Sequence, residues 1–112
     1  MHLDHAPFVK IKTGEKTIEL RLYDEKRRKI RAGDRILFAD CSAPSETLQA
    51  EVVALHRFKD FRELYAHLPL EKCGYGAAEV ISARAEDMLA YYSEEQQQAY
   101  GVLGIEIRLL PA

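Results

Sequence analysis

The spacing of apolar residues changes at Gly14, and this change constrains the fold more than any other feature of the chain. Residues 7–13 are typical of a short helix, because proline is tolerated in a first turn and Gly14 suits a left-handed C-terminal stop. From residue 17 the pattern has a period of two, with Ile18, Leu20 and Leu22 on one face. The sequence therefore predicts that a helix gives way to a strand at Lys16.

The other face of this predicted strand is polar and carries Glu19 and Arg21, close in sequence to Lys16. An ammonium, a carboxylate and a guanidinium so close together are ordinary on a solvated face and informative in a cleft. The spacing alone favours the solvated face and leaves the cleft open as the alternative.

The chain has 112 residues, enough for one hydrophobic core, and we expect residues 1–112 to form a single domain. Its composition, 47% hydrophobic and 30% charged, is ordinary for a globular protein. The formal net charge of -2 argues against a protein that coats nucleic acid through overall positive charge. Any phosphate contact would therefore come from a local patch.

No apolar run reaches the roughly 20 residues of a membrane span, and the N-terminus has no basic and apolar signal pattern. We therefore expect a cytoplasmic protein without a membrane partner. Cys41 and Cys73 are predicted to be free thiols, because two isolated cysteines do not make a disulfide framework. The histidines have no zinc-like spacing with either cysteine, so the sequence predicts no metal and no cofactor.

A dense basic cluster follows the predicted strand. Five of the six residues in 26–31 are cations: Lys26, Arg27, Arg28, Lys29 and Arg31. Such a cluster suits a rim that contacts phosphates, and it equally suits a solvated loop whose charge is balanced by neighbouring acids. Both interpretations stay open.

The same two periodicities predict further strands at residues 35–39, 48–58 and 102–110, and helices at 61–67, 82–92 and after Ser93. Residues 40–47 and 71–81 have no such pattern and are predicted to be loops. Because the helices interrupt the strands without β-α-β alternation, we expect an α+β, barrel-like domain with a mouth lined by loops.

Three segments resemble the ASCH domain, the activating-signal-cointegrator homology family of the PUA-like superfamily. They are Phe8-x-x-Ile11-x-x-Gly14-x-Lys16-Thr17-Ile18-Glu19-x-Arg21, Ile30-x-x-Gly33-Asp34-x-Ile36-x-Phe38 and Tyr100-Gly101-Val102-Leu103-Gly104-Ile105. The resemblance covers nearly the full chain. It implies a PUA-like small mixed or antiparallel β-barrel with flanking helices.

The resemblance also implies a cleft that binds RNA, a nucleotide or a modified nucleobase. In that setting Lys16, Glu19 and Arg21 would form the floor of the cleft, with Tyr100 as a wall. The basic residues Lys26, Arg27 and Arg28 would then belong to its rim. An exposed tyrosine can stack on a base, which contributes about 1 to 3 kcal/mol per base.

An alternative follows from small family members that deacetylate acetylated cytidine with a lysine, a threonine three residues later and a distant glutamate. Lys16 matches that lysine, but Glu19 occupies the threonine position. Counting along the chain from the matched segments places the distant glutamate at Glu79. Catalysis would then need Lys16 to accept a proton, or an activated water in place of the hydroxyl. A third interpretation, a protein-interaction surface, depends only on the aromatic pair Tyr91 and Tyr92.

Overall fold

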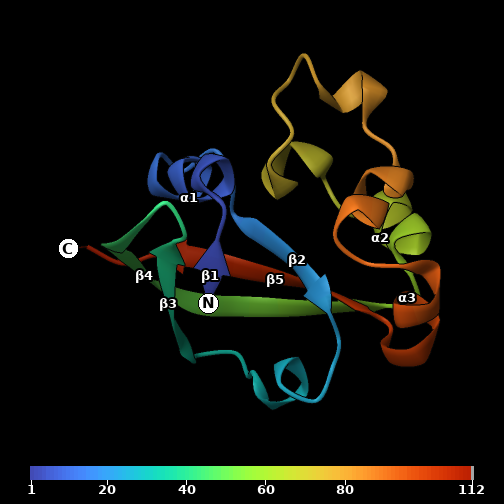
Figure 1. Cartoon of the computed structure of the whole chain (residues 1–112), viewed down its shortest axis with the longest axis horizontal. Helices are drawn as coiled ribbons and strands as arrows, with labels where there is room; N and C mark the ends of the chain where they lie inside the picture. The colour runs from blue at the N-terminus through green and yellow to red at the C-terminus, as the bar shows by residue number, and fades with distance from the viewer. Residues whose placement is uncertain (112) are drawn as a thin grey trace.

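The fold is seen in a computed structural model that describes residues 1–111 (Figure 1). Its strands are β1 (His2–Leu3), β2 (Ile18–Leu22), β3 (Arg35–Asp40), β4 (Ala43–Phe58) and β5 (Val102–Leu109). Its α-helices are α1 (His5–Lys12), α2 (Phe61–His67) and α3 (Glu94–Tyr100). Short 3-10 helices complete it: η1 (Arg27–Lys29), η2 (Leu70–Cys73), η3 (Val80–Ser82) and η4 (Ala85–Ala90).

The five strands form one sheet in the order β1-β3-β4-β5-β2. The short β1 runs parallel to β3, and every other neighbouring pair is antiparallel. The long β4 pairs with β3 along its first half and with β5 from Ala50 to Phe58, and the register shifts between Val52 and Ala54. Such a shift bends a strand, so the sheet curls into a half-barrel whose two edges are β1 and β2. This confirms the predicted α+β, barrel-like class.

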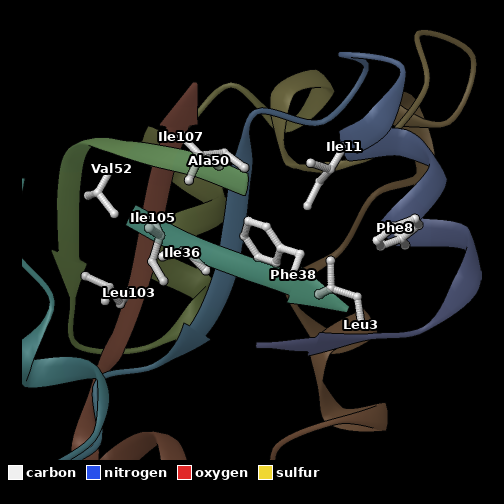
Figure 2. Packing of buried hydrophobic residues seen from close by; sticks show 10 residues of the cluster. All are labelled: Leu3, Phe8, Ile11, Ile36, Phe38, Ala50, Val52, Leu103, Ile105 and Ile107. Atoms are coloured by element: carbon white, nitrogen blue, oxygen red, sulfur yellow. The ribbon is translucent and has the colours of Figure 1, made fainter. Parts of the chain in front are cut away.

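Two hydrophobic clusters hold the elements together. The first lies between α1 and strands β3, β4 and β5, and Figure 2 shows its buried side chains, among them Phe8, Ile11 and Phe38. The second joins β2 to α2, with Phe61 and Leu64 fully buried against the β2 side chains. Because β2 and α1 belong to different clusters, the segment that connects them lies where the two clusters meet.

The predicted change from helix to strand is confirmed. Helix α1 ends at Lys12, Gly14 has a φ of +83°, and β2 begins at Ile18. The side chains of Ile18, Leu20 and Leu22 are buried in the second cluster, as the period of two predicts. The polar face of β2 is also covered: Glu19 is only 3% exposed, so the interpretation of a solvated face is wrong.

Two sequence-based expectations differ from the structure. The predicted loop 40–47 is a tight turn, because β4 already begins at Ala43, where it pairs with Asp40. The predicted helix 82–92 is instead the 3-10 helix η4, in which the Tyr91 N–H bonds to the Met88 carbonyl. Met88 packs into the second cluster and Tyr92 stacks on Phe61, so contacts with α2 determine the path of this segment.

Candidate functional site

A cavity of about 500 Å³ lies along the free edge of β2. In Figure 1, α1 and the yellow-to-orange segment of residues 70–92 stand on opposite sides of the start of β2. The lining comes from β1 and α1, from β2 with Lys16, and from residues 65–92: His2, Leu3, Asp4, Ala6, Pro7, Lys10, Lys16, Glu19, Leu20, Arg21, Tyr65, Cys73, Gly74, Tyr75, Glu79, Asp87, Met88, Ala90, Tyr91 and Tyr92. Segments far apart in the sequence therefore share one hollow.

Glu19 is the centre of a buried ion-pair group on the β2 side of the cavity. Its Oε1 lies 2.7 Å from the Lys16 Nζ, and its Oε2 lies 2.8 Å from the Arg21 Nη2 and accepts a hydrogen bond of 2.9 Å from the Arg21 Nε. Burial by itself raises the pKa of the Glu19 carboxyl, but Lys16 and Arg21 outweigh burial, so the pKa lies below its ordinary value. Glu19 is therefore a buried carboxylate that stays ionised at neutral pH.

Arg21 also connects the two edges of the half-barrel. Its Nη2 donates to the backbone carbonyl of His2, in β1, at 2.9 Å. The β1 and β2 strands are not paired with each other in the sheet, so this side chain spans the opening between them. The cavity lies beside that opening, since His2 and Arg21 both line it.

Lys16 is positioned by backbone contacts on both sides of the cavity. Its N–H bonds to the Lys10 carbonyl in α1, and the Thr17 N–H bonds to the Lys72 carbonyl in η2. Gly74 has a φ of +109°, and a Cβ built there would lie 3.3 Å from the Lys16 Cδ. Gly74 is therefore suited both to the left-handed backbone and to the close approach of the Lys16 side chain.

A second polar group lies where α1 approaches the loop after Gly74. The Lys10 Nζ donates to the Gly74 carbonyl and lies 3.7 Å from the Glu79 Oε1, which also accepts from the Gly76 N–H at 2.8 Å. The Gly76 N–H and then the Lys10 charge lower the pKa of the Glu79 carboxyl. Lys10 thus ties the loop to α1 across the cavity.

Four tyrosines also line the cavity: Tyr65, Tyr75, Tyr91 and Tyr92. The Tyr75 hydroxyl donates to the Asp87 Oδ2 at 2.7 Å, and the Tyr65 hydroxyl lies 2.7 Å from the Tyr75 hydroxyl. The two rings meet edge to face, with centroids 5.9 Å apart. Burial, followed by these hydrogen bonds, raises the pKa of Tyr75, so the phenol stays protonated and the chain of hydrogen bonds holds its ring in place. Tyr91, 61% exposed, extends the aromatic wall toward solvent.

Comparison with known proteins identifies the family of the chain. The family model described as "ASCH domain" matches residues 1–111. The chain belongs to the ASCH domain family. A search among curated proteins finds no match.

Two solved structures share the fold over essentially the whole of this ASCH domain. The hypothetical protein PH0355, known from a crystal structure, is 33% identical and superposes with a TM-score of 0.83, covering 98% of this chain and 96% of that one. The protein PF0455 from Pyrococcus furiosus, known from a solution NMR structure, is 32% identical with a TM-score of 0.66, covering 100% of both chains. Neither printed name states a ligand or an activity.

The structure brings together four of the residues that the sequence singled out. Lys16, Glu19 and Arg21 line the cavity of the ASCH domain, and Glu79 lines it from the opposite loop. Glu79, the residue matched to the distant glutamate of the deacetylating family members, thus lines the same cavity as Lys16. The roles of these residues in binding or catalysis stay predictions.

The other predicted contact residues lie outside the cavity lining. Arg27 pairs with Asp24 at 2.9 Å, and the Arg28 guanidinium lies 5.1 Å from the centre of the Tyr23 ring. Lys26 is exposed beside them, and Tyr100 lies at the end of α3. If these four residues contact a ligand, they do so beyond the cavity.

Sequence reasoning missed Lys10, Tyr65, Tyr75 and Asp87 as cavity residues. Four of the six tyrosines fall in residues 65–92, and this concentration was the available signal. Tyr91 and Tyr92, considered earlier only as a protein-interaction surface, line the same cavity. Nothing in the sequence marked Lys10, because its role depends on the approach of the Gly74 loop.

Over residues 1–111, no cluster of side chains suited to hold a metal ion is found, and Cys41 and Cys73 are both free thiols. Burial raises the pKa of the Cys73 thiol to about 11. No helix in that range is long and apolar enough to cross a membrane.

Proposed function

We propose that this ASCH domain binds RNA and takes one nucleobase, or a free nucleoside, into the cavity beside β2. The observation that carries the proposal is that the buried group of Lys16, Glu19 and Arg21 lines the same hollow as four tyrosines. ASCH domains are generally thought to bind RNA, which agrees with this proposal.

The size and walls of the cavity suit a planar ligand. Small-molecule sites typically have volumes of about 300 to 1,000 Å³, and this cavity has about 500 Å³. Single-stranded RNA is commonly recognised by stacking of splayed bases on aromatic side chains. Tyr75 offers a ring held by two hydrogen bonds, so stacking on it costs little side-chain entropy.

The floor offers hydrogen bonds to the edge of a base. An ammonium has three donors, and among residues 1–111 the only partner found for the Lys16 Nζ is Glu19. Among residues 1–111, Lys16 is the one ion-pair partner found for the Glu19 Oε1, so this oxygen can accept a further hydrogen bond. Lys16 and Glu19 together therefore present donors and an acceptor side by side, as the edges of bases do.

The same geometry supports hydrolysis of an acetylcytidine-like nucleoside less well. Glu19, at the threonine position, has a lowered pKa and is a weak base. Lys16 would have to give up its ion pair with Glu19 to accept a proton. Thr17, the nearest hydroxyl in sequence, does not line the cavity. We therefore keep deacetylation as an outcome of the test rather than as the proposal.

The proposal is tested by tyrosine fluorescence, because the chain has six tyrosines and no tryptophan. Titration with a short single-stranded RNA of mixed sequence should quench the emission saturably. Lys16→Met should weaken binding about tenfold, since a hydrogen bond from a charged group is worth about 1.5 to 3 kcal/mol. Lys12→Met removes the same charge from an exposed position of α1 outside the cavity and should bind as the parent does.

Three measurements decide between the possible outcomes: thermal unfolding, RNA titration and an activity assay. Thermal unfolding of both variants establishes that they are folded. RNA that fails to quench the parent protein, or equal effects of the two substitutions, would refute the proposal. Incubation with N4-acetylcytidine, followed by chromatography, separates binding from chemistry: turnover by the parent that Lys16→Met abolishes would establish the hydrolase instead.

A further inference from the structure

The cations that line the cavity are all engaged by acids or carbonyls. Lys16 and Arg21 share Glu19, while Lys10 is held by the Gly74 carbonyl and by Glu79. Each positive charge on the lining thus has a negative partner within 4 Å. Lys16 and Arg21 share a single carboxylate, however, so this group by itself keeps one net positive charge.

The acids, by contrast, outnumber the cations. Two carboxylates line the cavity in addition to Glu19 and Glu79, namely Asp4 and Asp87. Asp87 accepts from the Tyr75 hydroxyl and from the Arg84 N–H, which together lower its pKa. Asp4 precedes α1, and its side chain makes no capping hydrogen bond. With four carboxylates and three lysine or arginine cations, the lining has one more acid than base among these residue types.

The densest group of cations lies elsewhere, in the basic cluster of residues 26–31, where Lys26 and Lys29 are exposed and Arg27 pairs with Asp24. None of these side chains lines the cavity. Burial, then the charges of Lys26, Arg21 and Arg27, lower the pKa of the Met1 amino group, which is next in sequence to the lining residue His2. The basic cluster thus lies outside the cavity, whose lining carries more carboxylates than cations.

We infer that the cavity accepts only the phosphate-free part of its ligand, the base and ribose of a nucleoside or of one RNA residue, and that phosphates stay outside. The inference rests on the proposed function and specifies its ligand. A phosphate monoester carries nearly two negative charges at neutral pH, and a lining with four carboxylates and three cations repels each of them.

The inference predicts an order of affinities that is opposite to that of a nucleotide-binding site. The probes are the four ribonucleosides and their 5′-monophosphates. For every base that binds, the monophosphate should bind about threefold to tenfold more weakly than the nucleoside. The affinity of the nucleoside should not change between low and high salt, because an uncharged ligand releases no counterions. Tyrosine quenching or calorimetry measures both.

Asp4→Asn provides the sharper test. The substitution removes one negative charge from the lining and keeps a residue that suits a helix N-cap. It should reduce the preference for the nucleoside over the monophosphate at least about twofold, as removal of one like charge predicts. Glu46→Gln makes the same charge change on exposed β4, outside the cavity, and should leave the preference unchanged.

The outcomes separate the two proposals. If neither nucleosides nor RNA bind, the proposed function fails. If nucleosides bind but their monophosphates bind more tightly, or if Asp4→Asn and Glu46→Gln shift the preference equally, the site binds bases and the inference alone is overturned.

Discussion

Glu19 shows how a single position can reverse the expectation for a charged residue. A buried, isolated carboxylate would be neutralised, because burial disfavours the charged form. Here the Lys16 ammonium and the Arg21 guanidinium both contact it, and the pKa falls instead of rising. The charge is therefore retained inside the protein, where it orients the two cations.

Glu19→Gln should destabilise the fold by about 3 kcal/mol at pH 7, because it leaves two partly buried cations without their carboxylate. A lowered carboxyl pKa contributes stability that is present above the ordinary pKa of 4.5 and lost as the pH falls through the lower, folded-state pKa. The difference between variant and parent in urea unfolding should therefore shrink as the pH falls below 4.5. Glu46→Gln, on the surface, serves as the control. If the stability difference between Glu19→Gln and the parent is the same at pH 7 and below pH 4.5, Glu19 is not the stabilising carboxylate described here.

At the scale of elements, short helices are made stable by their caps and by one buried face. Helix α2 has only seven residues, so propensity alone would not maintain it. The Asp60 side chain accepts from the Glu63 N–H at 2.9 Å, and Phe61 and Leu64 are fully buried. The sequence predicted both bounds of this helix because cap and periodicity agree.

Asp60→Ala should lower the free energy of unfolding by about 1 kcal/mol, the usual value of an N-cap. Asp60→Asn retains an acceptor at the same position and should cost a few tenths of a kcal/mol at most. Urea denaturation of the three proteins measures the difference. Equal losses for the two substitutions would mean that the charge of Asp60, and not its cap hydrogen bond, stabilises α2.

Element prediction failed where tertiary contacts outweigh local pattern. Residues 82–92 have helical spacing, but the structure holds Met88 and Tyr92 against α2 and Asp87 on Tyr75, so η4 forms instead. Leu89, next to the buried Met88, is 45% exposed. The wall of the cavity is built from this segment, and its shape could not be read from periodicity.

At the scale of the whole molecule, the half-barrel separates two kinds of charge. The opening between β1 and β2 is spanned by Arg21 and borders an acidic cavity, while the basic cluster follows the end of β2, outside the cavity lining. For an RNA strand with one base in the cavity, this cluster is an exposed group of cations available to phosphates that stay outside. The overall net charge of -2 hides this division.

Lys26→Ala combined with Lys29→Ala should weaken RNA binding and reduce its salt dependence, because both lysines are exposed and form no ion pair among residues 1–111. The slope of log affinity against log salt should fall by about 0.7 for each lysine that contacts a phosphate of single-stranded RNA. Nucleoside binding should not change. The matched control is Lys12→Ala with Lys59→Ala, which removes two exposed charges elsewhere. RNA affinity that is flat from low to high salt would contradict the role of the cluster.

The sequence by itself determined the elements whose apolar side chains recur on one face. These are the change from α1 to β2 at Lys16, the strands β3 and β5, and the capped helices α2 and α3. It also indicated the family through residues that lie close together in the chain. Local periodicity reports which side chains share a face, and for this reason these features needed no knowledge of the fold.

Only the tertiary structure decided which segments cover the polar face of β2. The polar row of Lys16, Glu19 and Arg21 is buried because β1, α1 and the segment 65–92 converge on it, and periodicity contains no information about such distant segments. The tyrosine wall, the Lys10 contact with the Gly74 loop and the acidic interior arise in the same way. Contacts between segments far apart in sequence thus turned an ordinary row of charges into the floor of a cavity.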